Sequence, residues 1–245
     1  AGPDVFFSGC NVSQNMRSLG GSIGLVDSMR IGPDNGHDWG GVLTPIDHGS
    51  PLYFLNGRVW WNDPDPYYIR ANLTTDHARF LSSWVGITGF FALNSDWLPG
   101  LPAERLEIIK RIIPAHGVTA RPVDYFDNRF TTTWLVTDTR QAVRRDVIGL
   151  FNFHDGEMKV NDTCERFGLV PGKTYHAFDF WANEPIPDFT GSFKAQVAPR
   201  SCRVIAVRAD EGHPVVLSSS RHVTQGIVDI TDEVWLKGKL SATSK

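Results

Sequence analysis

The chain has 245 residues, of which 41% are hydrophobic, and this is enough to bury a large core in one or two domains. Its formal net charge is −3 and it has no basic stripe, so a nucleic-acid partner is not expected. It contains no apolar run of about 18 residues, so we expect no membrane-spanning helix. The N-terminal stretch lacks the pattern of a secretory signal peptide. The sequence does not indicate whether the protein is secreted or cytoplasmic.

The metal-binding residue types do not fall into a recognisable pattern. Cys10, Cys164 and Cys202 are few and widely spaced, which predicts neither a disulfide framework nor a zinc site. His37 and Asp38 lie close together, but their spacing matches no zinc motif. We therefore expect no functional metal ion and no organic cofactor.

In the first 117 residues, short apolar runs alternate with polar loops and helical patterns. Strands are expected at residues 4–10, 24–29, 59–61 and 87–93, the first as a buried strand. Helices are expected at residues 72–85, capped by Thr74 or Thr75, and at residues 102–113. The long segment 31–50 is rich in Gly, Pro and Asp and is expected to be a functional loop. This order predicts βα units with a parallel sheet.

Beyond Gly117 the helical patterns disappear. Short β-rich runs follow at residues 131–136, 146–153, 174–179, 192–197, 201–207 and 215–217. Turn signals such as His154-Asp155-Gly156 separate them, and this spacing is typical of an antiparallel sandwich. We therefore predict two domains, residues 1–117 and 118–245.

Two loops carry the residues that indicate chemistry. Arg30-Ile31-Gly32-Pro33-Asp34 follows one expected strand, and Trp61-Asn62-Asp63-Pro64-Asp65 follows another. Ligands bind at the carboxyl ends of parallel strands, and carboxylates beside aromatic rings suit a sugar. These loops predict a glycosidase. A loop salt bridge between Arg30 and Asp34 and an ordinary turn at Pro64 remain the non-functional alternatives.

These two loops resemble the Arg-x-x-x-Asp and Trp-Asn-Asp-Pro-Asp motifs of the α-galactosidases (melibiases) of glycoside hydrolase clan D, nearest families 27 and 36. Ser8-Gly9-Cys10 is similar to the substrate-contacting loop of their fifth barrel strand, and Asn94-Ser95-Asp96 to the loop after the eighth. The resemblance implies an α/β plus all-β chain, with the second half of a TIM (β/α)8 barrel followed by an antiparallel β-sandwich domain.

The resemblance also implies residue roles. Asp34 would be the general acid/base, Arg30 would contact the sugar, and Asp65 would lie at the floor of the site. Further candidates for substrate binding are Asp63, Trp61, Cys10 and Trp39. Retaining hydrolysis needs a second carboxylate about 5 Å from the acid. In the family this nucleophile is an Asp in a Lys-x-Asp motif of strand four, but no Lys precedes Leu25, so the nucleophile is expected from outside this chain.

The resemblance also implies partners. A half-barrel exposes unpaired strand edges and an open apolar interior. We therefore expect the missing half to come from the same longer protein, from another chain or from a homo-oligomer. The expected ligand is a carbohydrate substrate, without nucleic acid or membrane.

Three functions remain open at this stage. The first is a retaining exo-α-galactosidase, or the C-terminal part of one. The second is a non-catalytic carbohydrate-binding or structural fragment. The third is an α-N-acetylgalactosaminidase or a transglycosidase, and the loop at Asn11 to Gln14 would decide this choice.

Overall fold

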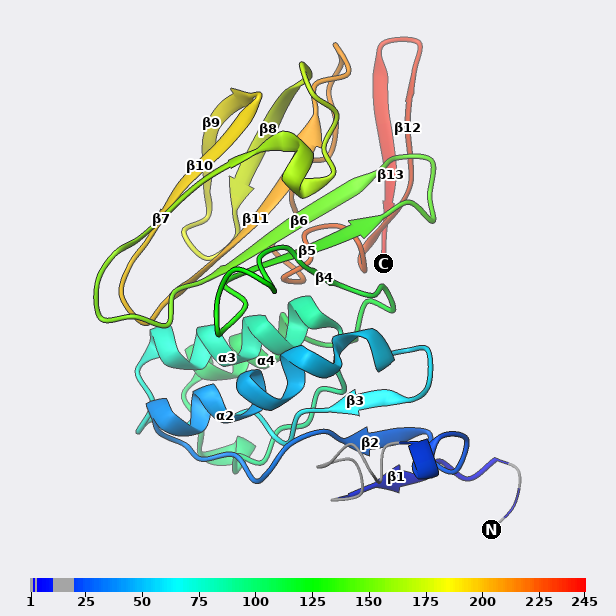
Figure 1. Ribbon diagram of the computed structural model, residues 1–245. Coiled ribbons are helices and arrows are strands. Elements are labelled where there is room, and N and C mark those ends of the chain that lie inside the picture. Colours follow the sequence, from blue (N-terminus) through cyan, green and yellow to red (C-terminus); the bar gives the residue numbers. More distant parts are fainter. Residues whose placement is uncertain (1, 3, 11–19) are drawn as a thin grey trace.

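The computed structural model describes residues 2, 4–10 and 20–245. Figure 1 shows three layers, with short parallel strands at the bottom, helices in the middle and antiparallel sheets at the top. The bottom layer consists of β1 (Ser8–Gly9), β2 (Ser28–Arg30) and β3 (Trp61–Asp63). The helices are α2 (Trp39–Gly49), α3 (Thr75–Thr88) and α4 (Ala103–Lys110). None of the described helices has the length and apolarity needed to cross a membrane.

The parallel strands lie in the order β1-β2-β3, as the βα pattern predicts. Arg30 pairs with Asp63 at the carboxyl end of this sheet. The backbone N–H of Phe91 donates to the carbonyl of Asn62 at 2.8 Å, so an extended segment continues the arc beyond β3. The chain thus contains part of a (β/α) barrel, and the described residues do not close it.

Three expectations for this layer are wrong in detail. Val5, Phe6 and Phe7 are exposed instead of forming a buried strand, although the ring of Phe6 contacts that of Phe91. The expected loop 31–50 contains α2, which begins where the side chain of Asp38 caps the N–H of Gly41. The expected strand 87–93 is partly helical, since α3 runs on through Thr88.

Both ends of α3 follow from local chemistry. The Thr74 side chain accepts a hydrogen bond from the N–H of His77 and caps the start, as expected. Gly89 ends the helix with φ of 69°, a left-handed conformation that glycine adopts without steric cost. A Cβ at this position would lie 2.9 Å from the His116 ring, so glycine is also needed for packing.

The upper part is a β-sandwich, as predicted. One sheet has six strands in the order β4-β5-β6-β11-β8-β9, and β7 pairs with β10 in a second, two-stranded sheet. A separate hairpin, β12–β13, stands beside the larger sheet (Figure 1). The bounds are β4 (Arg121–Pro122), β5 (Thr133–Asp138), β6 (Arg145–Phe151), β7 (Met158–Thr163), β8 (Thr174–Asp179), β9 (Glu184–Thr190), β10 (Ser192–Val197), β11 (Cys202–Ala209), β12 (Ile230–Leu236) and β13 (Lys239–Ser244).

The strand predictions in this part were incomplete. Residues 215–217 form no strand, and β4, β7, β9, β12 and β13 were not predicted. β9 contains Pro185 and Pro187, which a central strand rarely accommodates, and it lies at the edge of the sheet where proline is tolerated.

The central strands of the six-stranded sheet, β5, β6 and β11, are buried on both faces. In β6, Val147 and Phe151 belong to the core shared with the helices, whereas Ile148 and Leu150 face the core shared with β7 and β10. This alternation follows from the two-residue period of a strand. At Gly149 an added Cβ would lie 2.8 Å from the Phe151 ring, so glycine permits this packing.

The core under the helices joins the two parts of the chain. Trp84 of α3 is fully buried and contacts the ring of Trp134 of β5 edge to face, with centroids 6.3 Å apart. The sheet and the barrel segments therefore share one apolar core. The division of the chain into two domains near residue 117 stays a prediction.

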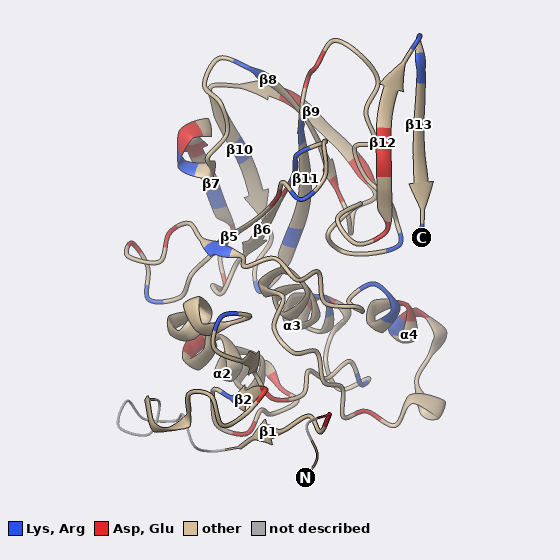
Figure 2. Ribbon diagram, turned by 90° about the vertical axis from the view of Figure 1, so that its right-hand side faces the viewer, with Lys and Arg blue, Asp and Glu red and all other residues tan. Residues whose placement is uncertain are grey.

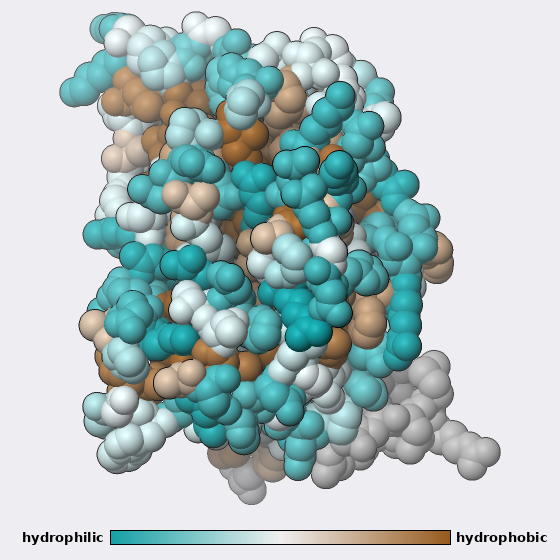
Figure 3. Space-filling model, turned by 90° about the vertical axis from the view of Figure 1, so that its left-hand side faces the viewer, coloured by the Kyte–Doolittle hydropathy of each residue, from teal (hydrophilic) through white to brown (hydrophobic). Residues whose placement is uncertain are grey.

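The surface carries charges of both signs. Figure 2 shows Lys and Arg interspersed with Asp and Glu in both parts of the molecule. The side shown in Figure 3, nearest β7, β9 and β10, is covered mainly by hydrophilic side chains, with smaller hydrophobic patches between them.

A buried ion pair fixes the C-terminal hairpin. Arg145 of β6 binds Glu233 of β12, and both side chains are almost completely buried. The other carboxylate oxygen of Glu233 accepts the N–H of Val216 at 2.7 Å. Removing one partner of such a pair leaves a buried charge without compensation.

We expect Arg145→Met to lower the free energy of unfolding by about 3–5 kcal/mol, because Glu233 is then buried and unpaired. Urea denaturation followed by circular dichroism measures the change. The control is the double variant Arg145→Met/Glu233→Met, which should recover much of the loss. A loss below about 1 kcal/mol in the single variant would show that the pair does not hold the hairpin.

His116 lies buried next to the end of α3. Its Nε2 is 3.0 Å from the carbonyl of Ile87, and its Nδ1 accepts the N–H of Val118 at 3.2 Å. Burial lowers the pKa of His116 to about 4, and the charges of His222 and Arg140 add to this effect. His116 is therefore neutral in the folded protein near pH 7.

This pKa makes stability depend on pH. The unfolded state binds a proton on His116 below about pH 6.5, and the folded state does so only near pH 4. Stability therefore falls as the pH is lowered through this window, by up to about 3 kcal/mol. We expect His116→Gln to reduce the slope of unfolding free energy against pH between 4 and 6.5. The control His154→Gln, at an exposed site, should retain the wild-type slope, and equal slopes for wild type and His116→Gln would contradict the assignment.

Candidate active site

Arg30 connects the two loops that the sequence analysis singled out. Its Nη2 lies 2.7 Å from Oδ1 of Asp34 and 2.9 Å from Oδ2 of Asp65. Arg30 ends β2, and Asp65 follows the end of the neighbouring β3. The parallel register therefore brings all three side chains to one edge of the sheet, as the strand pattern predicts.

The backbone at Asp65 is held in an uncommon conformation. Asp65 has φ of 73°, a left-handed geometry that aspartate adopts more readily than most residues. Its N–H donates to Oδ1 of Asp63 at 2.8 Å, which closes a local turn around Pro64. The hydrogen bond to Asp63 thus stabilises the turn that places the side chain of Asp65 next to Arg30.

Asn35 was not singled out in the sequence, and it ties the two loops together. Its N–H donates to Oδ2 of Asp65 at 2.7 Å. Its side-chain amide donates to the carbonyls of Pro64 and Pro66, each at 3.1 Å. The only sequence signal was its position directly after Asp34, so the bridge could not be predicted without the strand register.

The two carboxylates bound to Arg30 differ in exposure. The side chain of Asp65 is 13% exposed, whereas that of Asp34 is 94% exposed. Asp65 already accepts hydrogen bonds from Arg30 and Asn35. The free face of Asp34 is therefore the part of this cluster that can reach a ligand.

Burial has the largest effect on the pKa values of Asp63 and Asp65. It raises the pKa values of Asp63 and Asp65, and the positive charge of Arg30 opposes the rise at both carboxyls. Burial also acts to lower the pKa of Arg30, but the hydrogen bond with Asp34 and the charge of Asp65 outweigh it, so its pKa is raised. Arg30 is thus a permanent cation that holds both carboxylates.

Cys10 lies beside this cluster. Nη1 of Arg30 is 3.8 Å from its sulfur, and the thiol is free. The loop at Asn11 to Gln14, which was expected to decide between related sugars, lies outside the described residues. The role of Cys10 in substrate binding stays a prediction.

The tryptophans have different environments. Trp60 is buried and donates through Nε1 to Oδ1 of Asn62 at 3.0 Å, whereas Trp61 is partly exposed at the amino end of β3. This agrees with the expectation that adjacent strand residues face opposite sides. Trp39 packs against the rings of His77 and Phe80 at the start of α2. Substrate contacts of Trp61 and Trp39 stay predictions.

A chain of side-chain contacts extends from the same loops. The rings of His37 and Tyr68 meet edge to face, with centroids 6.1 Å apart. The guanidinium of Arg70 lies 4.4 Å from the Tyr68 ring and binds Asp96 at 2.6 Å. Asp96 thereby holds Arg70 against the Tyr68 ring.

Three polar residues that follow Asp34 in the chain have protein partners. Asp38 caps α2, His48 bonds the carbonyl of Thr44 at 2.9 Å, and Asp47 lies 3.6 Å from Arg129. Within residues 2, 4–10 and 20–245, no three His, Cys, Asp or Glu side chains are grouped to hold a metal ion.

We expect Arg30→Met to raise the pKa values of Asp63 and Asp65 further, because the cation that lowers both is lost. Carbon-detected NMR titration of the aspartate carboxyls measures this change. Arg129→Met, which removes an exposed arginine paired with Asp47, is the matched control and should leave both values unchanged. A fall of either pKa in Arg30→Met would contradict the electrostatic assignment.

The fold resembles that of known glycosidases. A candidate α-galactosidase from Bacteroides fragilis has a TM-score of 0.64 and 15% identity, over 82% of this chain and 47% of that one. A family 27 β-L-arabinopyranosidase from Geobacillus stearothermophilus has a TM-score of 0.63 and 16% identity, over 78% and 46%. An α-galactosidase from Saccharomyces cerevisiae, solved with raffinose, has a TM-score of 0.61 and 15% identity, over 84% and 64%.

No family model matches the sequence. At these identities the comparison concerns the fold, and the chain spans about half the length of the first two structures. The shared fold is a partial (β/α) barrel joined to an antiparallel β-sandwich, the arrangement that the motif resemblance implied. The protein therefore has a glycosidase-like fold, similar to that of family 27 glycoside hydrolases.

Proposed function

We propose that this chain is part of a retaining glycoside hydrolase that acts on terminal α-galactosides. The observation that carries the proposal is the cluster in which one guanidinium nitrogen of Arg30 binds both Asp34 and Asp65. This cluster lies at the carboxyl edge of parallel strands, where barrel enzymes place their catalytic groups. The glycosidase-like fold supports the same function.

Asp34 is the proposed general acid/base. It protonates the glycosidic oxygen as the bond to the leaving group breaks, and it then removes a proton from the water that attacks the glycosyl-enzyme. Its exposed side chain can reach a substrate, and Arg30 keeps it oriented from one side. A general acid must retain its proton near the working pH, and bound substrate together with further protein would provide the necessary burial.

Arg30 and Asp65 are the proposed sugar-positioning groups. Asp65 is largely buried and already engaged by two donors, which suits a fixed acceptor better than a nucleophile. The nucleophile is proposed to come from a strand outside this chain. The retaining reaction then has two carboxyl groups about 5 Å apart, one on each half of the barrel.

The exposed apolar residues near β1 support this completion. These residues precede β1 and β2 in the chain and are Val5, Phe6, Phe7, Ile23 and Leu25. Exposed apolar side chains of this size beside a sheet edge favour burial against further structure. We propose that additional barrel strands cover them, from the same protein, a second chain or a homo-oligomer.

A non-catalytic carbohydrate-binding fragment is the second candidate. The high exposure of Asp34 favours it for the isolated chain, because catalytic groups usually lie in a site that excludes water. Turnover by the completed barrel separates the two candidates.

An α-N-acetylgalactosaminidase or a transglycosidase would use the same acid/base. Comparing the hydrolysis of an aryl α-galactoside with that of its 2-acetamido analogue tests the first activity. Adding sugar acceptors and measuring transfer products tests the second.

We expect Asp34→Asn to lower the turnover of an unactivated α-galactoside such as raffinose about 100- to 10,000-fold, the usual contribution of a general acid. The measurement is galactose release by the protein in its natural full length. Circular dichroism should show a nearly unchanged fold, because the side chain is exposed.

The matched control is Asp38→Asn, four residues further along the same loop. Asp38 caps α2, and asparagine caps a helix equally well, so this variant should keep wild-type activity. Near-normal turnover by Asp34→Asn would exclude it as the acid/base. A wild-type protein that binds galactose without turnover would favour the binding fragment.

A further inference from the structure

The β-sandwich contains a cavity that is separate from the candidate active site. Its volume is about 390 Å³, within the range of about 300–1,000 Å³ that is usual for small-molecule sites. It lies between the ends of β6, β8 and β11 and the β12–β13 hairpin. Glu233, Trp235 and Leu240 line its hairpin side.

The hairpin presents one face to this cavity. Trp235 and Leu240 are cross-strand partners, and Glu233 is two residues from Trp235, so the three share a face. The indole of Trp235 is stacked on the imidazole of His213, with centroids 5.4 Å apart and planes at 4°. This gives the cavity a rigid apolar wall against which a ring can pack.

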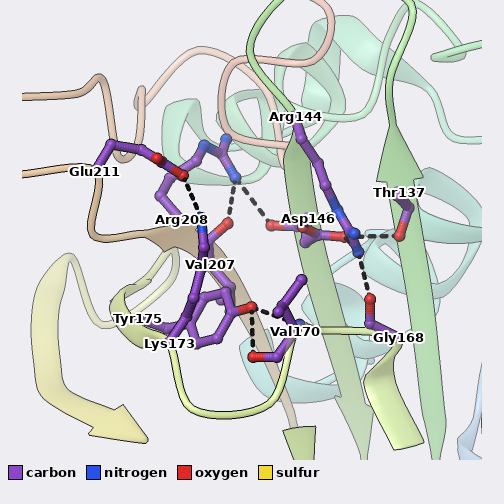
Figure 4. Close-up of polar contacts among 10 residues, drawn as sticks. All are labelled: Thr137, Arg144, Asp146, Gly168, Val170, Lys173, Tyr175, Val207, Arg208 and Glu211. Carbon is purple, nitrogen blue, oxygen red and sulfur yellow. Dashed lines mark hydrogen bonds and ion pairs between the residues drawn. The ribbon is translucent and has the colours of Figure 1, made fainter. Parts of the chain in front are cut away.

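Most charges of the cavity are already paired. Figure 4 shows Arg144 bound to Asp146 and Lys173 bound to Glu211. Asp146 also accepts the hydroxyl of Thr137 at 2.7 Å. The remaining carboxylate, that of Glu233, is held by Arg145 behind the cavity wall. Each carboxylate of the cavity is therefore already bound by a cation other than Arg208.

Arg208 is the exception. It is only 2% exposed, and its Nη1 donates to the carbonyls of Asp146 and Val207 at 3.0 and 2.8 Å (Figure 4). Its Nη2 donates to the carbonyl of Gln225 at 3.0 Å, while its Nε has no hydrogen-bond partner. Among the described residues, no carboxylate lies within ion-pair distance of Arg208.

A buried guanidinium whose only direct partners are carbonyls is costly, because no carboxylate is bound to it. Burial and the nearby charge of Arg145 lower the pKa of Arg208 to about 9, although the charges of Asp146 and Glu233 oppose this fall. An anion in the cavity would add a negative charge beside Arg208, which lines it. A carboxylate is the suitable anion, since its planar geometry matches a guanidinium.

We propose that this cavity is a second ligand site, which binds a small ring-shaped organic acid through its carboxylate. The carboxylate pairs with Arg208, and the ring packs over the face formed by Trp235 and Leu240. A sugar acid and an aromatic acid share this chemistry. The site is independent of the glycosidase assignment, because it uses none of the residues around Arg30.

Titration calorimetry at pH 7 with galacturonate, benzoate and galactose tests the proposal. At least one acid should bind and shift the indole N–H resonance of Trp235, and the tighter acid identifies the ligand as a sugar acid or an aromatic acid. Galactose, whose proposed site is at Arg30, should not shift this resonance. Failure of both acids to bind, an equal shift of the Trp235 resonance by galactose, or shifts confined to the Asp34 and Asp65 loops would overturn the proposal.

Two variants locate the site. Arg208→Gln should weaken acid binding at least tenfold. Trp235→Ala should also weaken it at least tenfold, and it replaces Arg208→Gln if loss of the buried arginine prevents folding. Trp97→Ala is the matched control, because Trp97 is 78% exposed and does not line the cavity. Unchanged acid binding in Trp235→Ala, or an equal loss in Trp97→Ala, would contradict the assignment.

Discussion

One largely buried guanidinium, that of Arg30, fixes the relative position of the two loops that form the candidate site. It needs anionic partners because its charge is removed from water, and it obtains them from Asp34 and Asp65 on neighbouring strands. The cluster exists only when β2 and β3 pair in the observed parallel register, since a shift by one residue would move Arg30 to the other face. Asn35 reinforces that register from the opposite loop. The geometry of the site is thus a consequence of strand pairing and charge pairing together.

The β-sandwich supports this arrangement through the helices. Trp84 of α3 packs on Trp134 of the six-stranded sheet, and Gly149 allows close packing at the same face. The other face of the sheet is covered by β7 and β10, so both faces are removed from water. The central strands β5, β6 and β11 are a rigid platform, because most of their side chains are buried and closely packed. The helices of the barrel segment are therefore packed against the sandwich, whereas apolar residues near β1 are exposed.

The sequence predicted the strands that carry the site because each apolar run ends in a short charged loop. It also predicted the start of α3 from Thr74, since capping is a local interaction. It did not predict α2, because a segment rich in Gly, Pro and Asp has weak helical propensity, and packing with its cap at Asp38 decides its structure. Edge strand β9 was missed because two prolines are compatible with a strand only at a sheet edge. The bridge made by Asn35 and the position of Arg208 among backbone carbonyls depend on contacts between distant segments. No local sequence pattern encodes such contacts.

The central claim is that Asp34 is the general acid/base of a retaining α-galactosidase. Azide rescue of Asp34→Gly tests it most directly, using an aryl α-galactoside whose leaving group needs no acid. Azide fits the space left by the missing carboxylate and attacks the glycosyl-enzyme in place of water. Our account predicts restored turnover and a galactosyl azide with the α configuration, because two inversions retain the anomeric stereochemistry. A β-galactosyl azide would instead show that Asp34 is the nucleophile, and it would contradict the account.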